Sequence, residues 1–223
     1  MNFWSKVFAV TRKDAMAEMR TKEIISAVLV FTFLVILIFN FAFGTDPQLV
    51  QQVAAGMIWA TFAFTGVLSL NRSFIMEKEE GCMEGLMVAP VEREVIYTGK
   101  MLGSLLFLLI VEAIALPIFA FLFNLDILSL KLIVIVLLTT IGFVSVGTLF
   151  SALAVNTKAR EMVLPILFLP IVSPIIISAV IASNLALAAG SWSSLMPSLQ
   201  IIIAFDVVFL VASFLVFGFV IEE

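Results

Sequence analysis

The chain has 223 residues, of which 63% are hydrophobic and 13% are charged, and its formal net charge at pH 7 is −4. The mean hydropathy of +1.23 implies more apolar surface than one soluble core can bury, which excludes a soluble globular protein. The composition therefore predicts an all-α integral membrane protein, which we expect to contact the lipid bilayer and no nucleic acid.

Residues 1–23 precede the first long apolar run and mix apolar with basic side chains. Helical spacing places the apolar ones mainly on one side, as is typical of an amphipathic helix lying in the membrane surface. They are Phe3, Trp4, Val7, Phe8, Met16 and Met19. Two roles stay open for this helix: an anchor for the first span, or a docking surface for a partner.

Six apolar stretches follow, each of about the 20 residues needed to cross a hydrocarbon core about 30 Å thick. They are predicted at about 24–43, 50–70, 101–123, 132–155, 162–182 and 199–221. The connections at about 44–49, 124–131 and 183–198 are predicted to face outward. They are too short to hold a folded outer domain.

The basic residues indicate how the spans are oriented, because Lys and Arg in short loops are retained in the cytoplasm. With the N-terminus inside, Lys131 is the one basic residue of the 12 that falls outside. An even number of spans then returns the C-terminus to the inner side. We therefore predict a single transmembrane domain over 1–223 with both termini cytoplasmic.

The connection at 71–100 is predicted to be a charged cytosolic loop in an otherwise apolar chain. Residues 82–87 place apolar side chains on one side of a short helix, and a proline follows to end it. Such a helix is marginal alone, so we expect it to dock in a groove of a protein partner. The predicted contact residues are Glu77, Glu79, Glu80, Gly81, Met83, Glu84, Leu86, Met87 and Pro90.

Two acids lie inside predicted spans. Glu112 is near the middle of the third span, where an unpaired carboxylate costs roughly 2.5 to 3.5 kcal/mol, so it is expected to face protein. Pro117 removes the hydrogen bond to the Ala113 carbonyl and leaves an acceptor nearby. A hinge or cavity contact and a satisfied structural hydrogen bond both stay open for Glu112. Asp206 is predicted about seven residues into the sixth span, within reach of water at the outer face.

Proline and glycine mark two further spans. Pro165, Pro170 and Pro174 interrupt the fifth span, which is therefore predicted to be broken or kinked, as a moving element or as static packing. The small residues Gly142, Gly147 and Ser151 in the fourth span predict close contacts between helices.

The chain lacks the residues for several kinds of chemistry. It has no histidine and one cysteine, which excludes His-based catalysis and His-ligated zinc or haem. It also has no G-x-x-x-x-G-K-[ST] loop, so we expect no ATP hydrolysis in this chain. No catalytic, cofactor-binding or metal-binding residue is predicted, and the chain is not expected to be an enzyme.

Several short motifs occur in an order that is similar to a known family. The pattern E-x-E-x-G-x-x-E-x-L-x-x-x-P at 77–90 resembles the cytosolic loop of type-2 ABC exporter permeases. More narrowly, the chain resembles cytochrome c maturation protein B (CcmB) in four places. These are Pro47-Gln48-Leu49, Gly56-Met57-Ile58-Trp59, Leu70-Asn71-Arg72-Ser73-Phe74, and the run from Leu164-Pro165 to Pro174.

The resemblance implies the permease subunit of an ABC transporter in a bacterial inner membrane, or in a homologous organellar one. Its implied partners are an ABC ATPase subunit, other cytochrome c maturation membrane proteins and a haem chaperone, with two membrane subunits per complex. Its implied function is to couple ATP hydrolysis by the partner to haem delivery, or to release of the haem-loaded chaperone. Haem would then be a handled substrate, and ATP would be bound by the partner alone.

Other functions stay open on the residues alone. One is a generic type-2 ABC exporter permease for a lipid, glycan or drug, and another is a membrane scaffold that transports nothing. A secondary transporter is less favoured, because the acidic loop would then have no purpose.

Overall fold

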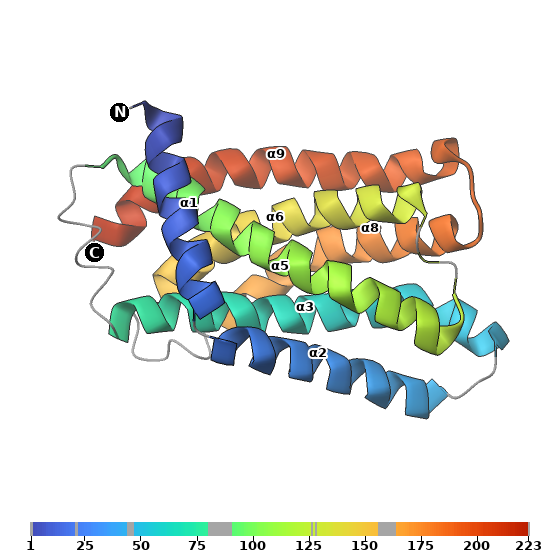
Figure 1. The fold of residues 1–223 in the computed structure, drawn as a ribbon. Helices are drawn as coiled ribbons and strands as arrows, with labels where there is room; N and C mark the ends of the chain where they lie inside the picture. Colours follow the sequence, from blue (N-terminus) through green and yellow to red (C-terminus); the bar gives the residue numbers. More distant parts are fainter. Residues whose placement is uncertain are drawn as a thin grey trace.

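The computed structural model describes residues 2–20, 22–43, 47–79, 91–125, 127, 129–155 and 164–222. The regular structure in these ranges is entirely helical (Figure 1). The elements are α1 (Phe3–Arg20), α2 (Lys22–Phe43), α3 (Pro47–Glu79), α5 (Arg93–Phe123), α6 (Leu130–Val155), the π-helix η1 (Leu164–Phe168), α8 (Leu169–Leu187) and α9 (Trp192–Glu222).

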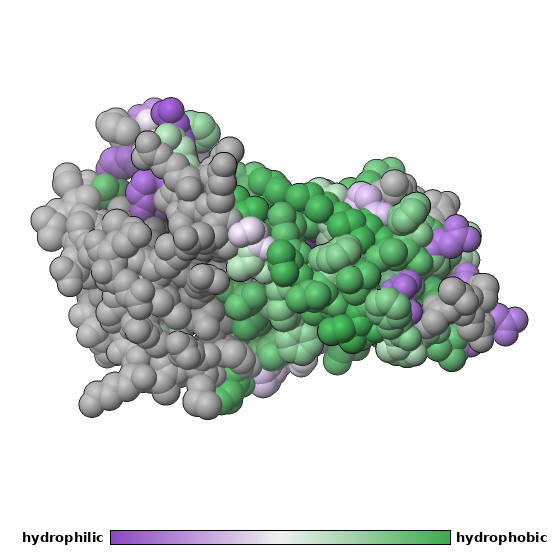
Figure 2. Space-filling view, turned by 60° about the horizontal axis from the view of Figure 1, so that its bottom comes forward, coloured by the Kyte–Doolittle hydropathy of each residue, from purple (hydrophilic) through white to green (hydrophobic). Residues whose placement is uncertain are grey.

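Six of the described helices are long and apolar enough to cross a membrane, which confirms the predicted six-span architecture. The spanning segments are Ile25–Phe43, Gln48–Leu70, Arg93–Phe123, Leu130–Ala154, Ile166–Leu187 and Trp192–Val220. Figure 2 shows the corresponding band of apolar side chains across the middle of one face, with hydrophilic residues at one tip. Every backbone polar group inside such a band must be satisfied within the protein, and helices meet this requirement.

The connection predicted over 183–198 is shorter in the structure than expected. Helix α8 continues to Leu187 and α9 begins at Trp192, so the connection is a turn. The alanine-rich sequence after Asn184 favours helix. The helix stops where Ala189 adopts a positive φ of 57°, just before Gly190.

The helices of the second and third spans also extend farther than predicted. Helix α5 begins at Arg93, and α3 continues to Glu79. Both helices therefore project into the segment predicted as the cytosolic loop, and the connection between them comprises residues 80–92. The two ends that it joins lie at the end of the bundle where α1 and both chain termini lie (Figure 1).

Helices α3 and α6 form the centre of the bundle. Over an apolar window of 18 residues in each of them, 67% of the residues are buried, whereas the proportion is 17% in α2 and 22% in α9. Helix α6 packs against α3, α5, α8 and α9. The peripheral helices α2 and α9 therefore present most of the apolar surface that faces lipid.

Two glycines allow α6 to approach its neighbours closely, as their positions predicted. A side chain added at Gly142 would overlap Asp206 and Ile175, and one added at Gly147 would overlap Leu70. Small residues at such contacts are how membrane helices gain van der Waals packing without a hydrophobic driving force between them.

Helix α1 crosses the end of the bundle and is held against α5 (Figure 1). A Cβ added at Gly99 would lie 2.6 Å from Val10 Cβ, so the two backbones meet there. Thr11 Oγ1 donates to the Gly99 carbonyl at 3.1 Å, and Lys100 Nζ lies 4.0 Å from Asp14 Oδ2. We call these contacts the α1–α5 joint.

The apolar residues predicted to share one side of α1 are divided between two faces. Val7 is buried against α5 with 2% of its surface exposed, whereas Trp4 and Phe8 are 70% and 69% exposed. Burial of one face on α5 holds the helix in place, and the exposed aromatic side chains are of the kind that enters the membrane interface.

We predict that Gly99→Ala destabilises the protein, because the new methyl group must displace Val10 at the α1–α5 joint. Overpacking of this kind costs about 1 to 3 kcal/mol. The measurement is the thermal midpoint of the detergent-solubilised protein. Gly56→Ala is the matched control, since nothing lies within 4 Å of its added Cβ. Equal midpoints for the two variants would contradict the close contact.

Candidate functional site

Glu112 is buried in the membrane-spanning part of α5, with 5% of its surface exposed. Thr140 on α6 donates its hydroxyl to the carboxyl group, with Oγ1 at 2.9 Å from Oε1 and 3.0 Å from Oε2. The prediction that this acid faces protein is therefore confirmed. Because one hydroxyl proton serves both oxygens, the carboxyl group keeps capacity to accept further hydrogen bonds.

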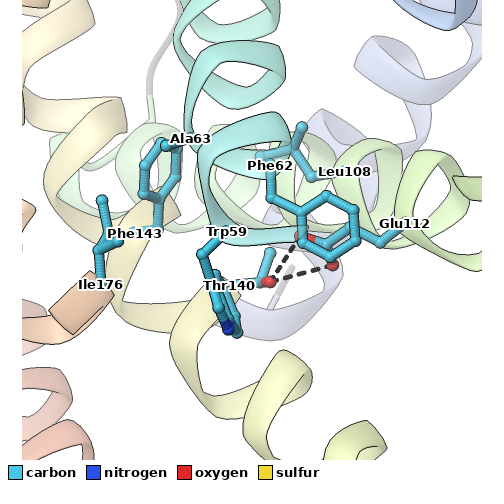
Figure 3. Close-up of a pocket in the computed structure, with 8 residues that line it drawn as sticks. All are labelled: Trp59, Phe62, Ala63, Leu108, Glu112, Thr140, Phe143 and Ile176. Atoms are coloured by element: carbon cyan, nitrogen blue, oxygen red, sulfur yellow. Dashed lines mark hydrogen bonds between the residues drawn. The ribbon is translucent and has the colours of Figure 1, made fainter. Parts of the chain in front are cut away.

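Glu112 and Thr140 border an enclosed cavity between α3, α5, α6 and α8 (Figure 3). Its volume of about 10 Å³ is close to the minimum for one water molecule. The rest of the lining is apolar or aromatic and consists of Trp59, Phe62, Ala63, Leu108, Phe143 and Ile176. The polar pair is thus surrounded by packed side chains, and the cavity is too small for an organic substrate.

Asp206 lies deeper in the structure than predicted. Since α9 begins at Trp192, the residue is about 21 Å along the helix and not near its outer end. It is 6% exposed and packs against Gly142 of α6. Among the described residues, its Oδ1 has no hydrogen-bond partner. The burial of the side chain gives no support to the expectation that water at the outer face reaches it.

The fifth span contains a change of helix type next to its prolines. Pro165 lies in the π-helix η1, and Pro170 lies at the start of α8, which follows η1 directly. Pro174 is inside α8, and the Pro174 carbonyl accepts from Ser178 Oγ at 2.8 Å. Pro117 similarly lies inside α5. Single-turn π segments accompany functional sites in many helices, and the predicted hinge role of these prolines stays a prediction.

Further polar contacts join the spans in pairs. Thr32 and Thr65 link α2 to α3 at 2.9 Å, and Trp59 Nε1 donates to Ser183 Oγ of α8 at 2.9 Å. Tyr97 OH lies 3.0 Å from Ser145 Oγ of α6. In none of these contacts is the partner Glu112 or Asp206. Within the described ranges, no three acidic or cysteine side chains gather as a metal site.

The predicted contact surface for a protein partner lies mostly outside the described residues. Glu77 and Glu79 form the last turn of α3, and their side chains are not described. Glu80, Gly81, Met83, Glu84, Leu86, Met87 and Pro90 fall outside the described ranges. The docking role of this segment stays a prediction.

The α1–α5 joint was not predicted from the sequence, although the spacing of two glycines in α5 is a signal for it. Gly99 and Gly103 are four residues apart on α5, a spacing that permits close helix contact. Both face α1, with Gly103 next to Asp14. Thr140 was also missed as the partner of Glu112, and nothing in the spacing of residues 28 positions apart identifies such a pair.

Six apolar helices that enclose two buried acids, with helix α1 bound across one end, define a multi-pass α-helical membrane protein. The chain belongs to the CcmB protein family, because the family model described as CcmB protein matches residues 5–222. The match confirms the resemblance found in the short motifs.

Individual relatives are similar to most of the chain. Heme exporter protein B of Rhodobacter capsulatus is 31% identical over 150 residues, which cover 67% of this chain and 69% of the relative. The protein of the same name in Pseudomonas aeruginosa is 29% identical over 150 residues, 67% of each chain. The Bradyrhizobium diazoefficiens protein of this name is 26% identical over 177 residues, 79% of this chain and 80% of the relative.

We predict that Thr140→Val destabilises the protein by about 1 to 3 kcal/mol, because it leaves the Glu112 carboxyl group buried without its donor. The free energy of unfolding is measured by titrating the detergent-solubilised protein with sodium dodecyl sulfate. Thr139→Val is the matched control. Its hydroxyl is fully buried and has no partner among the described residues, so its loss is expected to be neutral or stabilising. An equal loss in both variants would contradict a stabilising Glu112–Thr140 bond.

Proposed function

We propose that this chain is the permease subunit of an ABC transporter complex that handles haem for cytochrome c maturation. In this proposal a partner ATPase hydrolyses ATP, and the chain transmits the resulting movement to haem delivery or to release of a haem-loaded chaperone. Two copies of the chain would span the inner membrane, with both termini in the cytoplasm. The observation that carries the proposal is the family match over 5–222, together with the name of the relatives, Heme exporter protein B.

The connections at one end of the bundle are suited to receive force from a partner. The connection 80–92 leads directly into α5 at Arg93. Arg93 Nη1 donates to the Gly218 carbonyl of α9 at 3.3 Å, and six residues farther along α5 the α1–α5 joint begins at Gly99. A partner that moves this connection would thus act on α1, α5 and α9 together.

The interior supports a role in coupling over passage of haem through the centre of one chain. The enclosed cavity beside Glu112 has room for about one water molecule. Tightly packed interiors respond to force as rigid bodies. A large planar substrate does not fit in this cavity, so the proposal places haem outside it.

The first test is affinity purification of the tagged full-length chain in mild detergent, combined with measurement of holocytochrome c in a strain that lacks the gene. Recovery of an ATPase and haem-handling proteins, with loss of holocytochrome c in the deletion strain, supports the proposal. An ATPase alone with normal cytochrome levels would favour a generic exporter of lipid, glycan or drug. A complex that works normally with a catalytically dead ATPase would favour a scaffold.

We predict that Glu84→Lys abolishes recovery of the ATPase while membrane insertion is unchanged, because charge reversal in the acidic loop opposes docking on a basic partner surface. Recovery is measured by immunoblotting after purification from equal amounts of membrane. Glu222→Lys is the matched control, since it makes the same charge change at the end of α9 and outside the loop. Undiminished recovery with Glu84→Lys would place the ATPase contact elsewhere.

A further inference from the structure

The start of α5 is enclosed by other parts of the protein. Residues 93–105 are all buried or half-buried, whereas Leu106, Ile110 and Ile114 farther along the helix are 49%, 59% and 42% exposed. This end of α5 follows directly on the connection 80–92 and lies at the end of the bundle where α1 crosses (Figure 1). A displacement of the connection must therefore pass through a tightly packed helix end.

Tyr97 connects this end of α5 to α6, the central helix. Its side chain is 2% exposed. The hydroxyl group donates to the Ser145 carbonyl oxygen at 3.2 Å, and its oxygen lies 3.0 Å from Ser145 Oγ. The Tyr97 ring also packs against Phe217 of α9, with the ring centroids 5.2 Å apart. One side chain thus joins α5 to both α6 and α9.

The other contacts described above for this end of α5 reach different helices. Arg93 Nη1 donates to the Gly218 carbonyl of α9, and the α1–α5 joint holds Gly99 against α1. The Glu112–Thr140 contact with α6 lies 15 residues beyond Tyr97, about 22 Å along the helix. That contact is too distant to fix the start of α5 on α6, whereas the Tyr97 hydroxyl group is in the position to do so.

We propose that Tyr97 is a positioning residue for coupling, and that its hydroxyl group passes a displacement of the start of α5 to the central helix α6. The inference rests on the proposed function, in which a partner ATPase moves the connection 80–92. A hydrogen bond suits this task because it is directional and weakens steeply when it bends, so that the two helices keep their alignment as they move. Loss of the hydroxyl group leaves the ring against Phe217 and allows α5 to move without α6.

The test compares Tyr97→Phe with the wild-type chain in the complete complex. Recovery of the ATPase and the rate of ATP hydrolysis by the purified complex are expected to stay within about twofold of wild type, because the connection and the ring contact are unchanged. The yield of holocytochrome c is expected to fall about fivefold, since single residues change the coupling between distant sites by about 2- to 30-fold.

Two results of this comparison would overturn the proposal. One is an unchanged yield of holocytochrome c in the Tyr97→Phe strain. The other is an equal fall in ATPase recovery or in ATP hydrolysis, because Tyr97 would then act on assembly or on the ATPase itself and not on the step between hydrolysis and haem handling.

Thr32→Val is the matched control, because it also removes a buried hydroxyl group that links two spans. Thr32 Oγ1 lies 2.9 Å from Thr65 Oγ1, and this pair joins α2 to α3 without α5. The control is expected to form holocytochrome c at the wild-type level. An equal fall in both variants would overturn the proposal, since loss of any hydrogen bond between spans would then suffice.

Ser145→Ala tests whether α6 is the partner. It removes the Ser145 hydroxyl group and leaves the carbonyl oxygen that receives the Tyr97 proton, so a smaller fall than with Tyr97→Phe is expected. The double variant is expected to equal Tyr97→Phe alone, because both substitutions act on the same contact. A fall equal to the product of the two single effects would overturn the connection to α6.

A measurement on the full-length chain alone, in nanodiscs, separates failure of this inference from failure of the proposed function. Tyr97→Phe is expected to raise amide hydrogen exchange over residues 93–100 about fivefold, because this end of α5 opens more readily without its bond to α6. Thr32→Val is expected to leave exchange there unchanged. If the wild-type chain recovers no ATPase, the proposed function fails and the exchange result alone decides whether Tyr97 fixes the start of α5. Unchanged exchange in Tyr97→Phe would overturn the inference in either case.

Discussion

The fold depends on how closely α6 can approach the helices around it. Membrane helices gain little from hiding apolar surface from one another, because lipid is as apolar as they are, so close packing and internal hydrogen bonds must hold the bundle. Helix α6 supplies both. Gly142 and Gly147 allow α9, α8 and α3 to lie against its backbone. Thr140 and Ser145 form hydrogen bonds with Glu112 and Tyr97 of α5.

This arrangement explains why two acids persist in an apolar interior. Glu112 is held by a hydroxyl group from a neighbouring span, whereas Asp206 occupies the space left by a glycine. The first acid is connected to its surroundings and the second is packed without a described partner for Oδ1. Their different surroundings argue against a common role for the two acids.

The sequence predicted the architecture well because apolar length is a local property. The six spans and the family follow from runs of about 20 residues and from short ordered motifs. What it could not provide depends on contacts between distant residues. The role of Thr140 depends on Glu112 of α5, which is 28 residues away in the sequence. Asp206 lies farther from the start of its helix than predicted, because α9 already begins at Trp192. The Gly99–Gly103 spacing was readable but needed a partner helix to acquire meaning.

The length of α5 has a mechanical consequence. Its 31 residues form a rod of about 46 Å, so a tilt of about 5° at one end displaces the other by about 4 Å. The α1–α5 joint and the Arg93 contact lie at one end of this rod, and Pro117 lies near the other. A small rotation imposed at the α1 end is thereby converted into a displacement of atomic size at the far end of the helix, beyond the Glu112–Thr140 pair.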